Sequence, residues 1–209
     1  MNVLEERILQ LIGEDTDSPD IYPDTDEGLR PIRESLNDAV EEITMVTGSY
    51  KRKYYVPLQA NQIFYRLNLD PVSLGWITEA WLVSQRRRLE QKDLIYLESM
   101  DPRWMVSTGS QIYYFPVGDD IVGFWRMPSS SDVVELHCVV IPERYESSSD
   151  RIKLRTAYQW AAVHYVVSEW WASRGDAKEA LKHHTRYLEL LDLKDIYPYS
   201  REKTYRAKQ

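Results

Sequence analysis

The chain has 209 residues, with 26 Lys and Arg against 33 Asp and Glu, and a formal net charge of −7. Its single cysteine, Cys138, excludes a disulfide framework and any cysteine-based zinc site. No apolar run reaches the roughly 18 residues that a membrane span requires, so we expect a soluble protein.

The negative charge is concentrated in the first part of the chain. Residues 1–42 carry 13 acidic and 3 basic side chains, whereas residues 43–197 contain 19 of each sign. Residues 198–209 carry a net charge of +3. Opposite charges at two ends of a sequence often indicate two different contact surfaces, although solvated acidic helices and a frayed tail give the same pattern.

The first 49 residues predict two helices separated by a loop. Apolar residues recur at helical spacing over residues 3–12, and the Asp, Thr and Pro residues of 14–28 favour an exposed loop. A second helix is expected to begin near Arg30 and to end before Gly48. Its apolar residues form one stripe, and we place Arg33 among the acidic residues of the opposite, outer side.

From about residue 50 the apolar residues alternate with polar ones, which is typical of half-buried strands. A short helix over residues 90–100 interrupts the strands. We therefore expect a small antiparallel sheet, of sandwich or barrel type, whose strand pairing the sequence does not specify. The six candidate strands are residues 50–58, 63–69, 76–83, 111–115, 121–127 and 133–141.

The pattern becomes helical again after Pro142. Residues 152–173 are apolar almost all round, so at least two sides of this helix must be covered. Asp176, with Glu179 three residues later, fits a capping box at the start of a last helix over residues 177–193. Two helices joined by so short a turn pack antiparallel.

This order of elements predicts an α+β fold. The predicted architecture is a helical bundle formed by the N- and C-terminal helices, with an inserted small antiparallel β domain and an extended C-terminal arm. The segments are residues 1–49 (N-terminal helices), 50–142 (β domain with a short helical insertion), 143–195 (C-terminal helical hairpin) and 196–209 (arm).

The sequence contains no recognisable catalytic motif. His137 and Cys138 are adjacent on a predicted strand, so their side chains point to opposite faces and cannot form a dyad. His183 and His184 diverge by about 100° on a helix, unlike the i, i+4 pair that binds a metal ion. His164 is expected to be a hydrogen-bonded core residue. We therefore expect no enzyme, no cofactor and no metal site, although a carboxylate-based enzyme would leave no motif.

The basic run Arg86, Arg87 and Arg88 supports an alternative function as a nucleic-acid-binding protein. Glu90 and Asp93 follow it directly, and the acidic N-terminal region would repel a nucleic acid. We therefore interpret the run as facing solvent or an acidic partner. The acidic loop over residues 15–27 lacks the ligand spacing of an EF-hand, so we expect it to be solvated rather than bound to calcium.

Aromatic residues with a polar group are abundant, with 7 Trp and 15 Tyr against only 3 Phe. Such side chains favour partly hydrated protein interfaces. The end of the chain combines aromatic and cationic residues without a helical or strand period. A segment of this composition can become ordered on an acidic groove or stay disordered.

Three parts of the sequence, taken in order, resemble the head-to-tail connector, or adaptor, proteins of tailed bacteriophages, including the tail-tube A-like proteins. The first is the N-terminal helix and loop, ILQLIGED and IYPDTDEG, with the helix over residues 31–43. The second is the strand IYYFP at residues 112–116, with a later strand that ends VVIP at 139–142. The third is the aromatic helical hairpin over residues 158–191 with its tail. The resemblance covers about residues 3–205.

The resemblance implies a structural virion protein without enzymatic activity. Such proteins form a dodecameric adaptor ring that joins the portal vertex to the tail or to the next neck protein, and DNA passes through the central channel as non-specific cargo. The implied partners are the portal protein, a downstream tail or head-closure protein and further copies of the chain, with no membrane. The protein would be made in the host cytoplasm and reside in the neck or tail of the virion.

The resemblance also suggests roles for two groups of residues. In related proteins the C-terminal arm tends to run against the portal. A channel in which DNA slides should not bind phosphate, so acidic residues near its lumen are favourable. The arm implies a portal-binding role for Tyr197, Tyr199, Arg201, Lys203, Tyr205 and Arg206. The candidate channel-facing acidic residues are Asp24, Asp26, Glu27, Glu34, Asp38 and Glu41.

Overall fold

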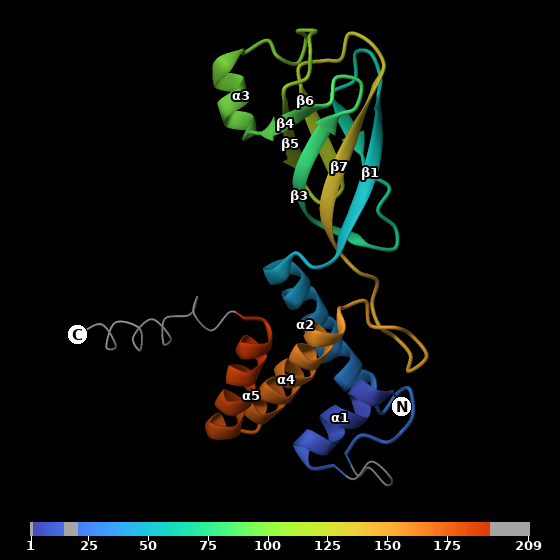
Figure 1. Ribbon diagram of the computed structural model, residues 1–209, viewed down its shortest axis with the longest axis vertical. Helices are drawn as coiled ribbons and strands as arrows, with labels where there is room; N and C mark the ends of the chain where they lie inside the picture. The colour runs from blue at the N-terminus through green and yellow to red at the C-terminus, as the bar shows by residue number, and fades with distance from the viewer. Residues whose placement is uncertain (1, 15–20, 193–209) are drawn as a thin grey trace, which may run out of the picture. The chain divides into compact units, whose positions relative to one another are not determined.

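The computed structural model describes residues 2–14 and 21–192, which fold into two compact units (Figure 1). The helical unit is formed by the described residues of Met1–Ser49 and Arg144–Gln209. The β unit is formed by Tyr50–Glu143. None of the helices in the described ranges is long and apolar enough to cross a membrane.

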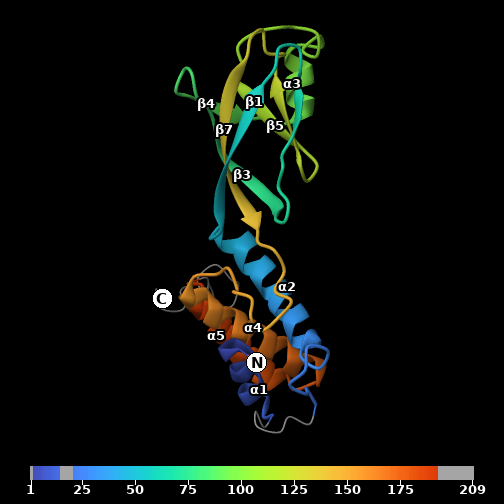
Figure 2. The same ribbon diagram turned by 90° about the vertical axis from the view of Figure 1, so that its right-hand side faces the viewer.

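Four helices form the helical unit: α1 (Val3–Ile12), α2 (Arg30–Thr47), α4 (Thr156–Ser173) and α5 (Ala177–Leu190). Helix α4 is central, because it packs against each of the other three (Figures 1 and 2). Its buried side chains are small, among them Ala161, Ala162 and Val163, which lets the neighbouring helices approach closely. Apolar residues on several sides of α4 are thus covered, as its sequence predicts.

The ends of the helices follow their local sequence. Asn2 caps α1 in a complete capping box, in which its side chain accepts from the backbone N–H of Glu5, and Glu5 accepts from the backbone N–H of Asn2. Asp176 caps α5 by accepting from the N–H groups of Lys178 and Glu179. The prediction of a second capping box is wrong, because the N–H of Asp176 donates to the carbonyl of Trp171 instead.

The β unit is a seven-stranded sheet in the order β1-β7-β3-β4-β5-β6-β2. All neighbouring strands are antiparallel except β4 and β5, which run parallel. The sheet curls into a nearly closed barrel (Figure 2). Its strands are β1 (Lys51–Leu58), β2 (Phe64–Arg66), β3 (Ser73–Leu82), β4 (Arg87–Gln91), β5 (Tyr113–Val117), β6 (Ile121–Trp125) and β7 (Asp132–Ile141), and a short helix, α3 (Leu94–Met100), follows β4.

The predicted fold class is therefore wrong in the size of the sheet and in the direction of its strands. Seven strands against five helices in the described residues are not a small insertion in a helical bundle, and the parallel pair makes the sheet mixed rather than antiparallel. Strand β4 was not predicted. Leu89 is the only buried residue of β4, so its sequence shows no alternation of apolar and polar residues.

The interior of the sheet is filled by side chains that alternate along the strands. On β7, Val134, Leu136, Cys138 and Val140 are all fully buried, which places Cys138 in the core as a small apolar residue. On β6, Gly123 is required by close packing, because a Cβ atom there would lie 2.3 Å from the ring of Phe115.

Candidate functional site

The helical unit contains a buried ion pair between α1 and α2. Arg33 Nε donates to Glu5 Oε1 at 2.7 Å, and the two side chains are only 4% and 0% exposed. Glu5 also accepts from the hydroxyl groups of Tyr145 and Ser148, both at 2.8 Å. Burial raises the pKa of Glu5, but the hydrogen bonds from Arg33, Asn2, Tyr145 and Ser148 outweigh it and hold that pKa below its usual value.

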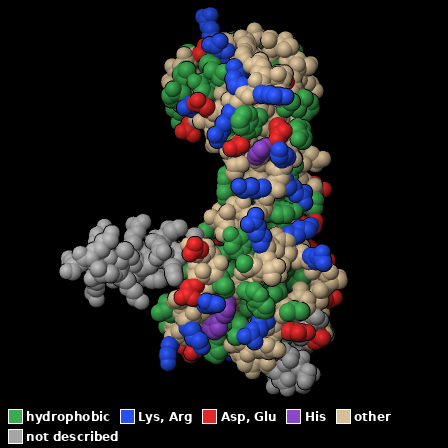
Figure 3. Space-filling model, viewed as in Figure 1, with side chains coloured by type: hydrophobic (Ala, Val, Ile, Leu, Met, Phe, Trp, Pro, Cys, Tyr) green, Lys and Arg blue, Asp and Glu red, His purple; other side chains and the backbone are tan. Residues whose placement is uncertain are grey.

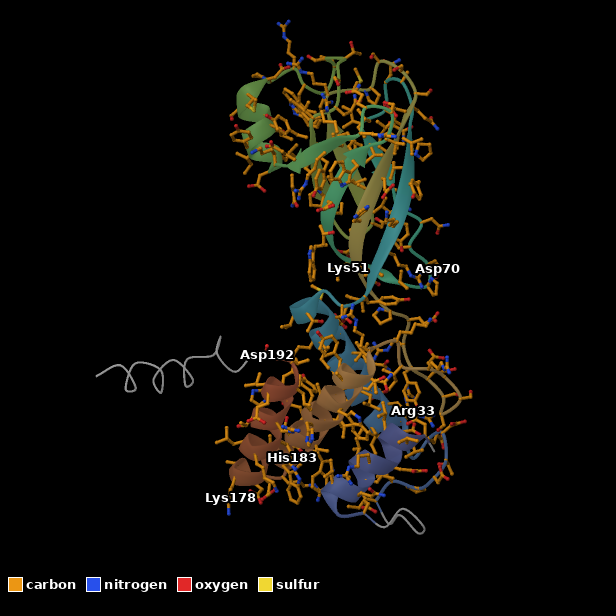
Figure 4. All side chains as sticks on the ribbon, viewed as in Figure 1. Arg33, Lys51, Asp70, Lys178, His183 and Asp192 are labelled. Carbon is orange, nitrogen blue, oxygen red and sulfur yellow. The ribbon has the colours of Figure 1, made fainter. Side chains whose placement is uncertain are left out.

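The remaining nitrogens of Arg33 bind segments far apart in the sequence. Nη1 donates to Asp26 Oδ1 and to the carbonyl of Glu146, each at 2.8 Å, and Nη2 donates to Ser148 Oγ at 2.7 Å. This Arg33 cluster, formed by Glu5, Asp26, Arg33, Tyr145 and Ser148, joins α1, the loop before α2, α2 itself and the chain entering the C-terminal helices (Figure 4).

The Arg33 cluster was not predicted from the sequence. The helical period of α2 places Arg33 on the outer, acidic side, but the structure buries it beside Ile32 and Leu36. The available signal was the Asn2-x-x-Glu5 capping box, which marks Glu5 as a residue with a structural role. The distant partners, Tyr145 and Ser148, could not be read from local spacing.

The six predicted channel-facing acidic residues are all exposed on the helical unit. Asp26 is bound to Arg33, and Glu34 pairs with Arg30 at 3.0 Å, so part of their charge is balanced. The six residues do not form a single site. Asp24, Asp26 and Glu27 precede α2, whereas Glu34, Asp38 and Glu41 lie along it. The six predicted portal-binding residues, Tyr197, Tyr199, Arg201, Lys203, Tyr205 and Arg206, lie outside the described residues, as does the predicted arm.

The basic run is largely engaged within the β unit. Arg87 Nη2 donates to Ser110 Oγ at 2.8 Å and to the carbonyl of Gln111. Arg88 lies 3.8 Å from Glu79 on the neighbouring strand β3. Because these two guanidinium groups already have acceptors, the run does not present three free cations to a phosphate backbone.

A network of charged and aromatic side chains crosses the outer face of β1, β7 and β3. Glu135 accepts from Lys53 at 2.6 Å and contacts His137 Nε2 at 2.6 Å, and His137 Nδ1 lies 3.6 Å from Glu79. Hydrogen bonds from Lys53 and His137 lower the pKa of Glu135 to about 2. Trp81 Nε1 donates to Glu79 at 3.1 Å. Balanced charge of this kind suits contact with a protein surface better than contact with a polyanion.

The histidines of the hairpin form a pair that sequence spacing did not reveal. His164 Nδ1 of α4 lies 2.9 Å from His183 Nδ1 of α5, and the rings stack with centroids 5.2 Å apart. Burial, reinforced by the neighbouring His183, lowers the pKa of His164 to about 4, and burial likewise lowers the pKa of His183. A contact between two ring nitrogens requires one of them to donate and the other to accept, and because both pKa values are lowered, both rings are neutral at neutral pH.

The described residues contain no group of three or more His, Cys, Asp and Glu side chains that could hold a metal ion. His137 and Cys138 lie on opposite faces of β7, with Cys138 buried and its pKa raised by burial to about 12. Among the surface hollows of the helical unit, one lies on α5 and has a volume of about 580 Å³.

The described residues thus offer structural ion pairs and mixed exposed faces of the kind that protein interfaces use. The family model described as SU10 adaptor protein matches residues 4–206. The chain belongs to the SU10 adaptor protein family, which confirms the resemblance to the head-to-tail adaptors of tailed phages. It is thus a structural adaptor protein of a phage particle and associates with other virion proteins. Comparison with curated protein sequences gives no match.

Proposed function

We propose that the chain forms an adaptor ring that joins the portal vertex to the tail or to the next neck protein, with a central channel for DNA. The observation that carries this proposal is the family match over residues 4–206, which spans both units. The abundance of Tyr and Trp supports it, because repeated contacts between identical subunits require extensive, partly hydrated interfaces.

Assembly with the portal tests this function directly. The purified chain is expected to be monomeric or weakly self-associating, and to form a ring when the portal protein of the same phage is added. Static light scattering of the mixture should give a mass well above that of the portal alone. A mixture whose mass equals that of the portal, with the chain remaining free, would show that the chain is not a portal adaptor.

Acidic residues of the segment before α2 are proposed to face the channel or its rim. Exposed carboxylates at Asp24 and Glu27 would repel the DNA backbone and keep it sliding. Replacing both with Asn and Gln in assembled particles should slow DNA ejection and raise the affinity of the ring for duplex DNA. Glu98→Gln, an exposed change on α3, is the matched control. Unchanged ejection and unchanged DNA affinity would overturn the channel-facing assignment.

The C-terminal arm is proposed to dock on the portal through its aromatic and cationic side chains. A chain truncated after Leu193 removes all six proposed portal-binding residues while keeping the helices α1 to α5. We expect the truncated chain to keep its helical circular dichroism and to lose the ring on the portal. Normal assembly of the truncated chain would contradict the role of the arm and leave the ring proposal in place.

A further inference from the structure

The exposed side of α5 carries a hollow that contains an unusually exposed leucine. Leu181 is 62% exposed, and the other residues that line the hollow are polar or charged. An apolar side chain in this setting gains free energy when a partner covers it. The hollow has a volume of about 580 Å³ and is lined by His164, Lys178, Leu181, Lys182, His183, Thr185, Arg186 and Glu189.

The charges around Leu181 are mainly positive and are only loosely held. Lys182 binds Glu179 at 2.7 Å and Arg186 binds Glu189 at 3.0 Å, both as exposed pairs on the surface of α5. Lys178 makes no ion pair within the described residues. Figure 4 shows Lys178 near the start of α5 and His183 further along it, and Figure 3 shows basic side chains beside the histidines on this side. Because exposed pairs are weak, these cations can exchange their partners for those of an acidic surface.

Helix α2 presents a stripe of the opposite charge. Glu34, Asp38, Glu41 and Met45 follow one another at helical spacing and are all exposed, with Met45 41% exposed. Asp38 and Glu41 make no ion pair in the part of the chain that the structure describes. The stripe therefore combines unpaired carboxylates with an apolar side chain, as the hollow combines ammonium groups with Leu181.

We propose that the hollow on α5 binds the outer stripe of α2 from a second copy of the chain. In this contact Met45 covers Leu181, and Asp38 and Glu41 face Lys178 and Lys182. The hollow and the stripe share no residue, so the contact is head-to-tail, and repetition of such a contact generates a ring when its rotation closes. The inference rests on the proposed adaptor ring and names the surfaces that build it.

Charge favours the second copy over the chain's own end as the occupant of the hollow. Residues 193–209 contain five basic and two acidic side chains, so this segment has the same sign as the cations around Leu181. The stripe of α2 has the opposite sign and adds an apolar group. Binding of DNA phosphate to the hollow is the competing outcome, and it would leave Leu181 uncovered.

Cross-linking between two single-site cysteine variants tests the contact. The only native cysteine, Cys138, is buried in the β unit, and its pKa is raised to about 12, so it will not react. Leu181→Cys and Met45→Cys chains are mixed in equal amounts with the portal and treated with a short bismaleimide. We expect a covalent dimer on a denaturing gel from the mixture only, because neither variant alone carries both of the introduced thiols. Rings that form without this dimer would overturn the proposal.

Reversal of charge gives an independent test with a built-in rescue. Lys178→Glu with Lys182→Glu, and separately Asp38→Lys with Glu41→Lys, should each lower the yield of rings on the portal at least tenfold. A chain that carries all four changes should recover most of that yield. The double variant Lys51→Glu with Arg103→Glu changes two exposed cations of the β unit and is the matched control.

The outcomes separate this inference from the proposed function. If the wild-type chain forms no ring with the portal, the adaptor function itself fails. If the wild-type chain forms rings and both charge-reversed variants form them equally well, the ring stands and the α5–α2 contact is wrong. Loss of DNA binding in the Lys178→Glu, Lys182→Glu variant with undiminished ring formation would assign the hollow to phosphate and also overturn the contact.

Discussion

Arg33 carries a permanent charge into the interior of the helical unit. Each of its three guanidinium nitrogens donates to an acceptor, and these acceptors come from α1, from the loop before α2 and from the segment at residues 146–148. A buried charge is tolerated only when its hydrogen-bonding groups are satisfied in this way. Arg33 therefore fixes the relative placement of elements that are more than a hundred residues apart in sequence.

Removal of Arg33 should destabilise the helical unit strongly. Arg33→Met leaves the Glu5 carboxylate buried without its ion-pair partner, and breaking a buried pair in this way costs about 3–5 kcal/mol. Urea unfolding followed by helical circular dichroism measures the change. Arg30→Met is the control, since Arg30 and Glu34 are 74% and 56% exposed and such a pair contributes about 1 kcal/mol or less. Equal effects of the two variants would contradict the role of the cluster.

The paired histidines predict a dependence of stability on pH. The pKa of His164 is about 4 in the folded chain, below the ordinary value of 6.5, so the unfolded chain binds more protons between these values. The contribution of neutral His164 to the free energy of unfolding is therefore fully present above pH 6.5 and is lost as the pH falls toward 4. Each proton that the chain takes up on unfolding changes the free energy of unfolding by at most about 1.4 kcal/mol per pH unit. Arg186 and Arg7 lie near His164 and oppose its protonation, and Lys182 does the same at His183.

His164→Gln keeps a polar side chain and removes this titration. We expect the free energy of unfolding of the variant to fall less steeply than that of the wild type between pH 6.5 and 4.5. Thermal unfolding at several pH values in this interval gives the slopes. Identical slopes in the two proteins would show that the pair does not couple protons to folding. His184→Gln, on the same helix as His183 but outside the pair, is the matched control.

At the scale of elements, the positions of α1, α2 and α5 could be predicted because each shows an apolar stripe and an end signal. Helices α1 and α2 end at Gly13 and Gly48, both in the left-handed conformation, and Asp176 starts α5. Strand β4 could not be predicted, because a strand with one buried residue carries no periodicity. The parallel pairing of β4 with β5 depends on contacts far apart in sequence, which local patterns do not encode.

The candidate surfaces were predictable only in part. The acidic side of α2 follows from helical spacing and is exposed, but the spacing also placed Arg33 on that side, where it is buried instead. The hollow on α5 has no sequence signature, since helical spacing groups Leu181 with Leu188, which is buried. Whether an apolar residue at the edge of a stripe is covered depends on the angle at which α4 and α5 cross, and the sequence alone does not specify this angle.

Strand β6 gives a prediction at the level of packing between elements. Gly123→Ala places a methyl group 2.3 Å from the ring of Phe115 on β5, and overpacking of this kind costs about 1–3 kcal/mol. Unfolding of the β unit, followed by tryptophan fluorescence, measures the loss. Adding Phe115→Leu makes room for the methyl group, so the double variant should lose less than the sum of the two single changes. Strict additivity would contradict the proposed clash.

At the scale of the whole molecule, family membership and the distribution of charge support the same account. The chain belongs to a family of phage adaptor proteins, and its described surface offers an acidic stripe on α2 and a cationic hollow on α5. The proposed adaptor ring would require contacts with further copies of the chain and with different proteins above and below. Two faces of opposite charge allow identical subunits to follow one another in one direction only.

Electron microscopy of the chain mixed with the portal protein of its phage tests the central claim most directly. The account predicts an additional ring of density on the portal, coaxial with the portal channel and open at its centre, that is absent from images of the portal alone. Portal particles that look the same with and without the chain, under conditions where both proteins are folded, would contradict it.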